Sequence, residues 1–138
     1  KELLVLIDED SNAFNQIMQA YQLKKKTDKD KKNRQKTIVL ATKHAIDIPL
    51  IIMRKSTEML TLMVDLIEYG NKNSFSDGAV ASELLISSVR GAYYNVKINL
   101  KDLDDSNYIE SIVKESESIL ADASYNYNAV LKFIDKEL

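Results

Sequence analysis

Hydrophobic residues recur every three or four positions along most of the chain, a spacing typical of amphipathic helices. Asp10 is the one charged position on the stripe of the first segment. An unpaired carboxylate among buried apolar side chains costs on the order of several kcal/mol. Asp10 therefore faces a partner or a solvated cleft, or it marks an exposed break in the helix, and the pattern leaves both interpretations open. The predicted inner stripe comprises Leu3, Ile7, Asp10, Phe14, Ile17 and Tyr21.

A long second helix is predicted between a basic run, KKKTDKDKKNRQK at residues 24–36, and Gly70. Thr27 followed three positions later by Asp30 resembles a capping box, which places the start of the helix inside the basic run. Pro49 predicts a kink in this helix, because proline removes a backbone donor and clashes with the preceding turn. The predicted inner stripe comprises Arg34, Ile38, Ala41, Ala45, Ile48, Ile52, Met59, Leu62 and Leu66.

The segment GNKNSFSDG, residues 70–78, is the strongest loop signal in the interior of the chain. A third helix over about 76–100 is apolar on more than one side, which predicts the central and most buried helix. A fourth helix is predicted over about 106–136. Residues 1–138 are therefore expected to form one all-α domain, an antiparallel bundle of long helices.

The composition narrows the possible functions. Three glycines and one proline in 138 residues are too few for the hairpins of a sandwich or barrel. No apolar run approaches the roughly 20 residues of a membrane span, and a net charge of -2 gives no reason to expect nucleic acid. The absence of cysteine excludes disulfides and a thiol nucleophile and suits the cytoplasm. With one histidine as well, we expect no metal site.

Several polar residues occupy unusual positions and are the candidate functional residues. On the third helix Asp77, Asn95 and Asn99 lie along one line, which also carries Ser88. A buried asparagine needs partners for both its donors and its acceptor, so it either clamps two helices together or contacts a ligand. The clamp is favoured modestly from spacing alone. The candidates are Asp10, Arg34, Asn71, Asn73, Ser76, Asp77, Asn95 and Asn99.

Four ordered pieces of the sequence resemble the cyclodeaminase and methenyltetrahydrofolate cyclohydrolase family, the helical domain at the C-terminal end of formiminotransferase-cyclodeaminase. Arg34 also falls where that family carries an arginine opening its second helix. The family has a further N-terminal portion with a glycine-rich turn that this sequence lacks, so we expect the true N-terminus to be missing. The pieces are DSNAF at 10–14, AIDIPL at 45–50, GNKNSFSDGAVAS at 70–82 and AYYNVKINL at 92–100.

The resemblance implies folate one-carbon chemistry in a homodimer, with no cofactor beyond the tetrahydrofolate substrate and no metal. A cyclodeaminase closes 5-formiminotetrahydrofolate to 5,10-methenyltetrahydrofolate and ammonia, whereas a cyclohydrolase opens the methenyl carbon with water. We favour the first activity and keep the second as the alternative. A non-catalytic helical module that binds a partner protein through its apolar stripes is the rival from another class.

Either reaction needs a group that moves a proton at nitrogen and hydrogen bonds that fix the ring. The resemblance assigns the proton transfer to Asp77 or Asp10, and the orientation of the substrate to the other polar candidates. Arg34 and the lysines at 24–26 would attract the glutamate tail of the folate. A plain solvated loop is the competing interpretation of those lysines. The orienting residues are Ser76, Asn71, Asn73, Asn95 and Asn99.

Overall fold

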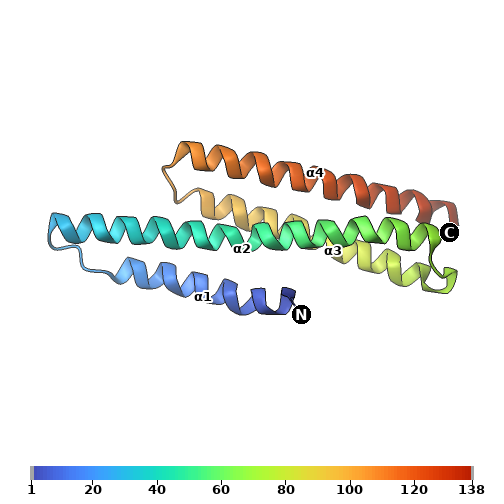
Figure 1. The fold of residues 1–138 in the computed structure, drawn as a ribbon, viewed down its shortest axis with the longest axis horizontal. Helices are drawn as coiled ribbons and strands as arrows, with labels where there is room; N and C mark the ends of the chain where they lie inside the picture. The colour runs from blue at the N-terminus through green and yellow to red at the C-terminus, as the bar shows by residue number, and fades with distance from the viewer. Residues whose placement is uncertain (1, 138) are drawn as a thin grey trace.

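The computed structural model describes residues 2–137 as four long antiparallel helices joined by short turns, with no strand in that range. Figure 1 shows α1 and α4 on opposite sides of α2, with α3 running beside α2. The all-α bundle predicted from the sequence is confirmed. No helix within the described range is long and apolar enough to cross a membrane. The elements are α1 (Glu2–Gln22), α2 (Asp28–Tyr69), the 3-10 turn η1 (Lys72–Ser74), α3 (Phe75–Leu100) and α4 (Ser106–Glu137).

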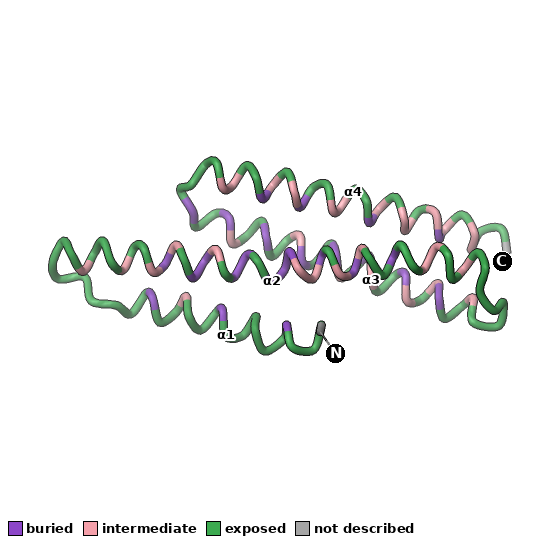
Figure 2. The backbone as a smooth tube through the Cα atoms, viewed as in Figure 1, coloured by how far each residue is buried: buried purple, intermediate pink, exposed green. Residues whose placement is uncertain are grey.

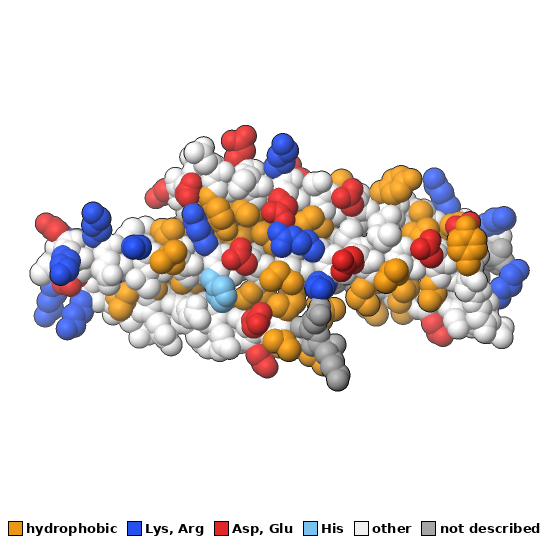
Figure 3. All heavy atoms as spheres, in the orientation of Figure 1, with side chains coloured by type: hydrophobic (Ala, Val, Ile, Leu, Met, Phe, Trp, Pro, Cys, Tyr) orange, Lys and Arg blue, Asp and Glu red, His pale blue; other side chains and the backbone are white. Residues whose placement is uncertain are grey.

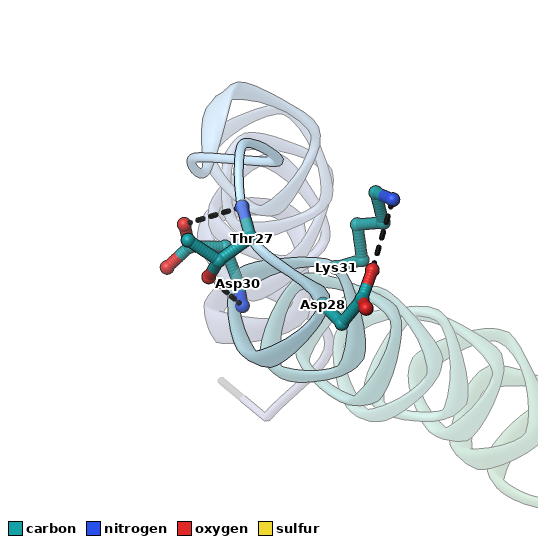
Figure 4. A network of polar contacts seen from close by, with 4 residues as sticks. All are labelled: Thr27, Asp28, Asp30 and Lys31. Carbon is teal, nitrogen blue, oxygen red and sulfur yellow. Dashed lines mark hydrogen bonds and ion pairs between the residues drawn. The ribbon is translucent and has the colours of Figure 1, made fainter.

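The helix ends are set by local chemistry that could be predicted from the sequence. At the start of α2 the Thr27 hydroxyl accepts from the Asp30 backbone N–H, and the Asp30 carboxylate accepts from the Thr27 N–H, both at 3.1 Å (Figure 4). At its end the Gly70 N–H donates to the Leu66 carbonyl at 2.9 Å. These caps satisfy backbone groups that a helix end leaves unpaired, so the predicted limits of α2 are confirmed.

The main hydrophobic core lies where α2, α3 and α4 meet. Burial follows one stripe along each helix, as the colours of Figure 2 show. One polar pair lies inside this interface: the hydroxyl oxygens of Ser56 and Ser88 are 3.1 Å apart, so two small side chains satisfy each other where the helices meet. Among the core residues are Ile46, Leu50, Met53, Leu60, Ile86, Val89, Val96, Leu100, Ile112 and Ala123.

The sequence-based prediction for α1 was wrong about which stripe is buried. The buried side chains are Leu6, Ala13 and Ala20, whereas Ile7 is 62% exposed and Phe14 is 61% exposed. The physical reason is that α1 packs mainly on α2 and needs only a narrow face, where alanines allow close approach. The large apolar side chains therefore lie along the edge of the contact.

Two expectations about the longer helices change. α2 packs against each of the other three helices, and it therefore occupies the central place that the sequence favoured for α3. α2 continues through the buried Pro49 as one helical element, and the kink expected there stays a prediction. α3 begins and ends within one residue of its predicted limits, but it keeps a row of exposed apolar residues, including Val80, Leu84 and Ile98.

Candidate active site

A groove where α1 lies against α2 and α3 gathers three of the candidate residues. It consists of two adjoining hollows that share Asp10 and Asn95, and we call it the α1 groove. The first hollow, of about 170 Å³, is lined by Asp10, Phe14, Ile17, Ala45, Asn95 and Asn99. The second, of about 380 Å³, adds residues from all three helices, among them Ile7, Pro49, Ile52 and Ser88.

Asp10 is the acidic group of the groove. Its side chain is exposed and accepts no hydrogen bond from the described residues, so its carboxylate remains available to a ligand. Phe14 lies one helical turn further along α1 and Ile17 one turn beyond, and both line the same hollow. A carboxylate beside two apolar walls suits a flat ring that carries hydrogen-bond donors.

The two asparagines of α3 differ in what they contact. Asn99 is half-buried, and its Nδ2 donates to the backbone carbonyl of Ala45 in α2 at 3.2 Å. It therefore clamps α3 to α2, one of the two roles predicted for it, while also lining the groove. Asn95 is exposed in the groove, and its amide has no hydrogen-bond partner among the described residues. Both donors and the acceptor of Asn95 are thus open to a ligand.

The remaining polar candidates lie elsewhere in the chain. Asn71, Asn73, Ser76 and Asp77 are all exposed around the turn between α2 and α3, where the Asn71 Oδ1 accepts from the Asn73 N–H at 3.0 Å. Asp77 is 18 residues from Asn95 on one helix, which corresponds to about 27 Å along its axis. Within a single chain the structure therefore brings Asp10, Asn95 and Asn99 together but leaves this second group apart.

Arg34 closes the opposite end of the molecule. Its Nε and Nη2 donate to the Tyr21 carbonyl at 3.2 and 3.1 Å, and its guanidinium lies 5.3 Å from the centre of the Tyr21 ring. These contacts cap α1 against α2. Lys24, Lys25 and Lys26 are exposed in the adjoining turn, and Figure 3 shows Lys and Arg side chains gathered at that end. The glutamate tail stays a prediction for this region.

Pro49 and Ser88 also line the groove, although neither is among the candidates predicted from the sequence. In the sequence, Pro49 indicates a kink and lies within a family piece, and Ser88 indicates close packing and lies on the polar line of the third helix. A larger hollow, of about 720 Å³, lies between α2 and α4 and contains none of the candidates; Arg54, Thr61 and Tyr125 are among its lining residues. Within residues 2–137 no cluster of three or more histidine or acidic side chains could hold a metal ion.

Residues 1–118 match the sequence profile of the formiminotransferase-cyclodeaminase family. The chain belongs to this family. The resemblance stated from the four sequence pieces is thereby confirmed. Among curated relatives, the chain is 39% identical over 123 residues to the methenyltetrahydrofolate cyclohydrolase of Methylorubrum extorquens, an alignment that covers 89% of this chain and 59% of that protein.

Other members of the formiminotransferase-cyclodeaminase family match along nearly the whole chain. The formimidoyltransferase-cyclodeaminase of Gallus gallus is 30% identical, with 98% of this chain and 25% of that protein covered. The crystal structure of formiminotetrahydrofolate cyclodeaminase from Thermotoga maritima superposes with a TM-score of 0.85 at 28% identity and covers 97% of this chain and 63% of that one. The chain thus spans about three fifths of the shorter relatives.

Proposed function

We propose that this chain provides the folate-binding and catalytic groove of a one-carbon enzyme that converts 5-formiminotetrahydrofolate to 5,10-methenyltetrahydrofolate and ammonia. One observation carries the proposal: Asp10, Asn95 and Asn99 converge with Phe14 in one groove of a chain that belongs to the formiminotransferase-cyclodeaminase family. The proposed location is the cytoplasm, because a chain without cysteines forms no disulfides and needs no oxidising compartment.

The reaction is a ring closure followed by an elimination. N10 of the folate attacks the protonated formimino carbon, which becomes tetrahedral between N5, N10 and the departing nitrogen. The N10 proton is then moved to the departing nitrogen, which leaves as ammonia while the N5–C–N10 unit keeps the positive charge. One carboxylate beside the two nitrogens performs both halves of this transfer. In this proposal Asp10 is that group, and its charge also stabilises the cationic carbon.

The other groove residues orient the substrate. The Asn95 amide offers donors and an acceptor to the ring, Asn99 adds a second polar contact, and the side chains of Phe14 and Ile17 cover the ring faces. The lysines at 24–26 provide positive charge for the glutamate tail at the α1–α2 turn. None of these roles requires a metal or a redox group.

Cyclohydrolase activity is the second candidate, and the 39% identity to a protein of that name favours it specifically. In that reaction water adds to the methenyl carbon and loses one proton, which gives a neutral tetrahedral intermediate. The remaining hydroxyl proton then passes to N5 as the C–N5 bond breaks, which leaves a formyl group on N10. The same carboxylate serves as the base. The same groove and the same carboxylate can therefore serve either a lyase that releases ammonia or a hydrolase that consumes the methenyl group.

An assay of both activities tests the proposal. Ammonia release from 5-formiminotetrahydrofolate supports the cyclodeaminase, whereas loss of methenyl absorbance without ammonia supports the cyclohydrolase. We expect Asp10→Asn to lower kcat by about 100-fold or more, and the matched control Asp8→Asn, an exposed acid on the same helix that lines neither hollow, to retain it. Absence of tetrahydrofolate binding by calorimetry at high micromolar ligand would overturn both activities and leave the protein-interaction module as the explanation.

The proposal includes a homodimer, and the exposed apolar row of α3 supports it. In an antiparallel pairing of α3 with α3 of a second copy, centred on position 89, a residue before position 89 in one copy lies opposite the residue that is equally far after position 89 in the other copy. Small residues then meet at the centre, where nothing lies within 4 Å of a Cβ built on Gly91, and large apolar residues meet on both sides. The opposed pairs are Ser87 with Gly91, Leu84 with Tyr94, and Val80 with Ile98.

Charge and site geometry agree with this pairing. Lys97 falls within two positions of the partner's Glu83 on one flank, which places opposite charges together. On the other flank the partner's Asp77 comes opposite position 101, about 3 Å along the axis from Asn99. The second polar group, remote in a single chain, is thereby carried to the α1 groove of the other copy. Asp77 is accordingly the proposed second carboxylate of a site shared between two subunits.

A further inference from the structure

Pro49 leaves one carbonyl of α2 without its helical partner. In a helix the backbone N–H of each residue donates to the carbonyl four positions earlier. Proline has no N–H, so the carbonyl of Ala45 cannot receive this bond. Both Pro49 and Ala45 are buried and lie beside the α1 groove. A buried carbonyl without a donor is costly, and a replacement donor is required.

The replacement comes from α3. Nδ2 of Asn99 donates to the Ala45 carbonyl at 3.2 Å. Only the amino end of the amide can do this, because the oxygen end carries no hydrogen. The orientation of the Asn99 amide is therefore fixed by chemistry, with Nδ2 towards α2 and Oδ1 on the opposite branch of the amide.

The oxygen of the same amide is open to the groove. Asn99 Oδ1 accepts no hydrogen bond from the described residues, and yet it is absent from the fully buried unpaired polar atoms of the described part, where Tyr108 Oη stands alone. Asn99 also lines the smaller hollow together with Asp10. Oδ1 is thus a solvent-accessible acceptor held beside a carboxylate.

We infer that Pro49 is a positioning residue: by depriving the Ala45 carbonyl of a helical donor, it holds the Asn99 amide so that the groove presents an acceptor. This fixed acceptor, Asn99 Oδ1, then selects a ligand whose ring edge carries an N–H donor, such as an aminopyrimidine ring, while Asp10 stays free for the proton transfer at the other end of the ring system. The identity of this ligand as a folate rests on the proposed function, whereas the coupling between Pro49 and Asn99 does not.

A stability cycle tests the coupling without any ligand. Pro49→Ala restores the N–H that the Ala45 carbonyl lacks, so residue 99 should then matter little to folding. We expect Asn99→Asp to raise the equilibrium constant for unfolding by about ten-fold in the wild type and by about two-fold beside Pro49→Ala. Asn95→Ala is the matched control, because Asn95 lines the same hollow without bonding the backbone, and its effect should be the same in both backgrounds.

Ligand affinity tests the acceptor in the background where folding no longer depends on it. With Pro49→Ala present, Asn99→Asp keeps an acceptor and should retain tetrahydrofolate binding, whereas Asn99→Ala should weaken it about five-fold. Pro49→Ala alone should weaken it about two-fold, because the amide then divides between two orientations. A 2-desamino-2-methyl folate, which lacks one ring donor, should not distinguish aspartate from alanine at position 99.

Each outcome decides one part. Equal stability costs of Asn99→Asp with and without Pro49→Ala would overturn the coupling, whether or not the protein binds folate. Equal affinities of the aspartate and alanine variants would overturn the acceptor role. A coupled stability cycle in a protein that does not bind tetrahydrofolate would uphold the positioning by Pro49 and reject the proposed function.

Discussion

The Nζ of Lys43 lies 2.7 Å from Oδ2 of Asp105, so the middle of α2 is bonded to the residue that precedes α4. The other oxygen of the same carboxylate accepts from the Tyr108 backbone N–H at 3.2 Å and caps α4. One side chain therefore both starts the last helix and ties it to α2.

This relationship predicts a pH dependence. The Lys43 hydrogen bond, followed by the Tyr108 N–H, lowers the pKa of Asp105 below its ordinary value of 3.8. A carboxyl whose pKa is lower in the folded state stabilises the protein above the unfolded pKa, and this contribution disappears as the pH falls through the folded pKa. We expect Asp105→Asn to melt at a lower temperature than the wild type at pH 7, and the difference to shrink below about pH 4.

Circular dichroism melts between neutral and strongly acid pH measure this difference. Asp104→Asn is the matched control, because Asp104 is an exposed acid beside Asp105 with no partner among the described residues. A gap between wild type and Asp105→Asn that stays constant down to the lowest pH would contradict the assignment to the Lys43 pair.

Tyr108 predicts a second, alkaline transition. Its Oη is buried without a hydrogen-bond partner among the described side chains, and burial, followed by the charges of Asp47, Asp105 and Glu115, raises its pKa to about 12. A raised pKa means that the neutral phenol supports the fold fully below the ordinary value of 10, and that this support is lost as the pH rises through about 12.

We therefore expect Tyr108→Phe to be neutral or to gain up to about 1 kcal/mol at pH 7, because it removes a polar group that has no partner. Its unfolding free energy should also fall less steeply than that of the wild type above pH 10. Urea unfolding at the two pH values measures both effects. Tyr125→Phe, at an exposed ring, should leave the wild-type pH dependence in place. A clear loss of stability in Tyr108→Phe at pH 7 would reveal a bond to Oη.

Arg34 predicts a local loss of structure. Removing its two bonds to the Tyr21 carbonyl with Arg34→Ala should cost about 1–2 kcal/mol, with the amides of α1 exchanging faster than those of α3 in hydrogen-exchange measurements. Arg34→Lys keeps the charge but not the paired donors and should recover only part of this. The Michaelis constant for polyglutamylated folate separates the tail-binding role, which ends if Arg34→Ala leaves that constant unchanged.

Local chemistry explains what could be predicted from the sequence. Thr27 and Asp30 cap each other across three residues, and Gly70 ends α2 four residues after Leu66, so both signals are complete within one short segment. The packing of one helix on another cannot be predicted from such local signals. The hydrophobic pattern of α1 fits two faces, and the face that is buried depends on how closely the alanines let α1 approach α2.

The candidate site shows the same limit. Asp77 and Asn95 share one line of α3, and the periodicity of the sequence therefore grouped them. They are nevertheless far apart along the helix axis, because 18 positions separate them. Pro49 carried a signal that could have been read further: an interior proline implies an orphan carbonyl, and Asn99 in the next helix is a side chain able to satisfy it. That prediction also required knowing that α3 packs against α2 at this position, which the sequence does not specify.

The shared-site proposal predicts a complementation between two inactive proteins. If each groove uses its own Asp10 and the partner's Asp77, then Asp10→Asn and Asp77→Asn are each inactive as homodimers. After the two are unfolded and refolded together in equal amounts, half of the dimers are mixed, and each mixed dimer holds one groove with both native carboxylates. The mixture should then recover about a quarter of the wild-type activity.

The control is an Asp10→Asn, Asp77→Asn double variant refolded with wild type. Its mixed dimers have no intact shared groove, because each groove lacks one of the two carboxylates. Only the wild-type homodimers, a quarter of all dimers, stay active, so the mixture should have about a quarter of the activity of the same total amount of wild-type protein. Gly91→Leu, at the centre of the α3 row, should give a monomer by sedimentation and abolish the rescue. No activity in the first mixture, with dimers present, would place both carboxylates in one subunit, because only a groove built from two chains can be repaired by mixing. An Asp77→Asn homodimer that is already active on its own would remove Asp77 from the reaction.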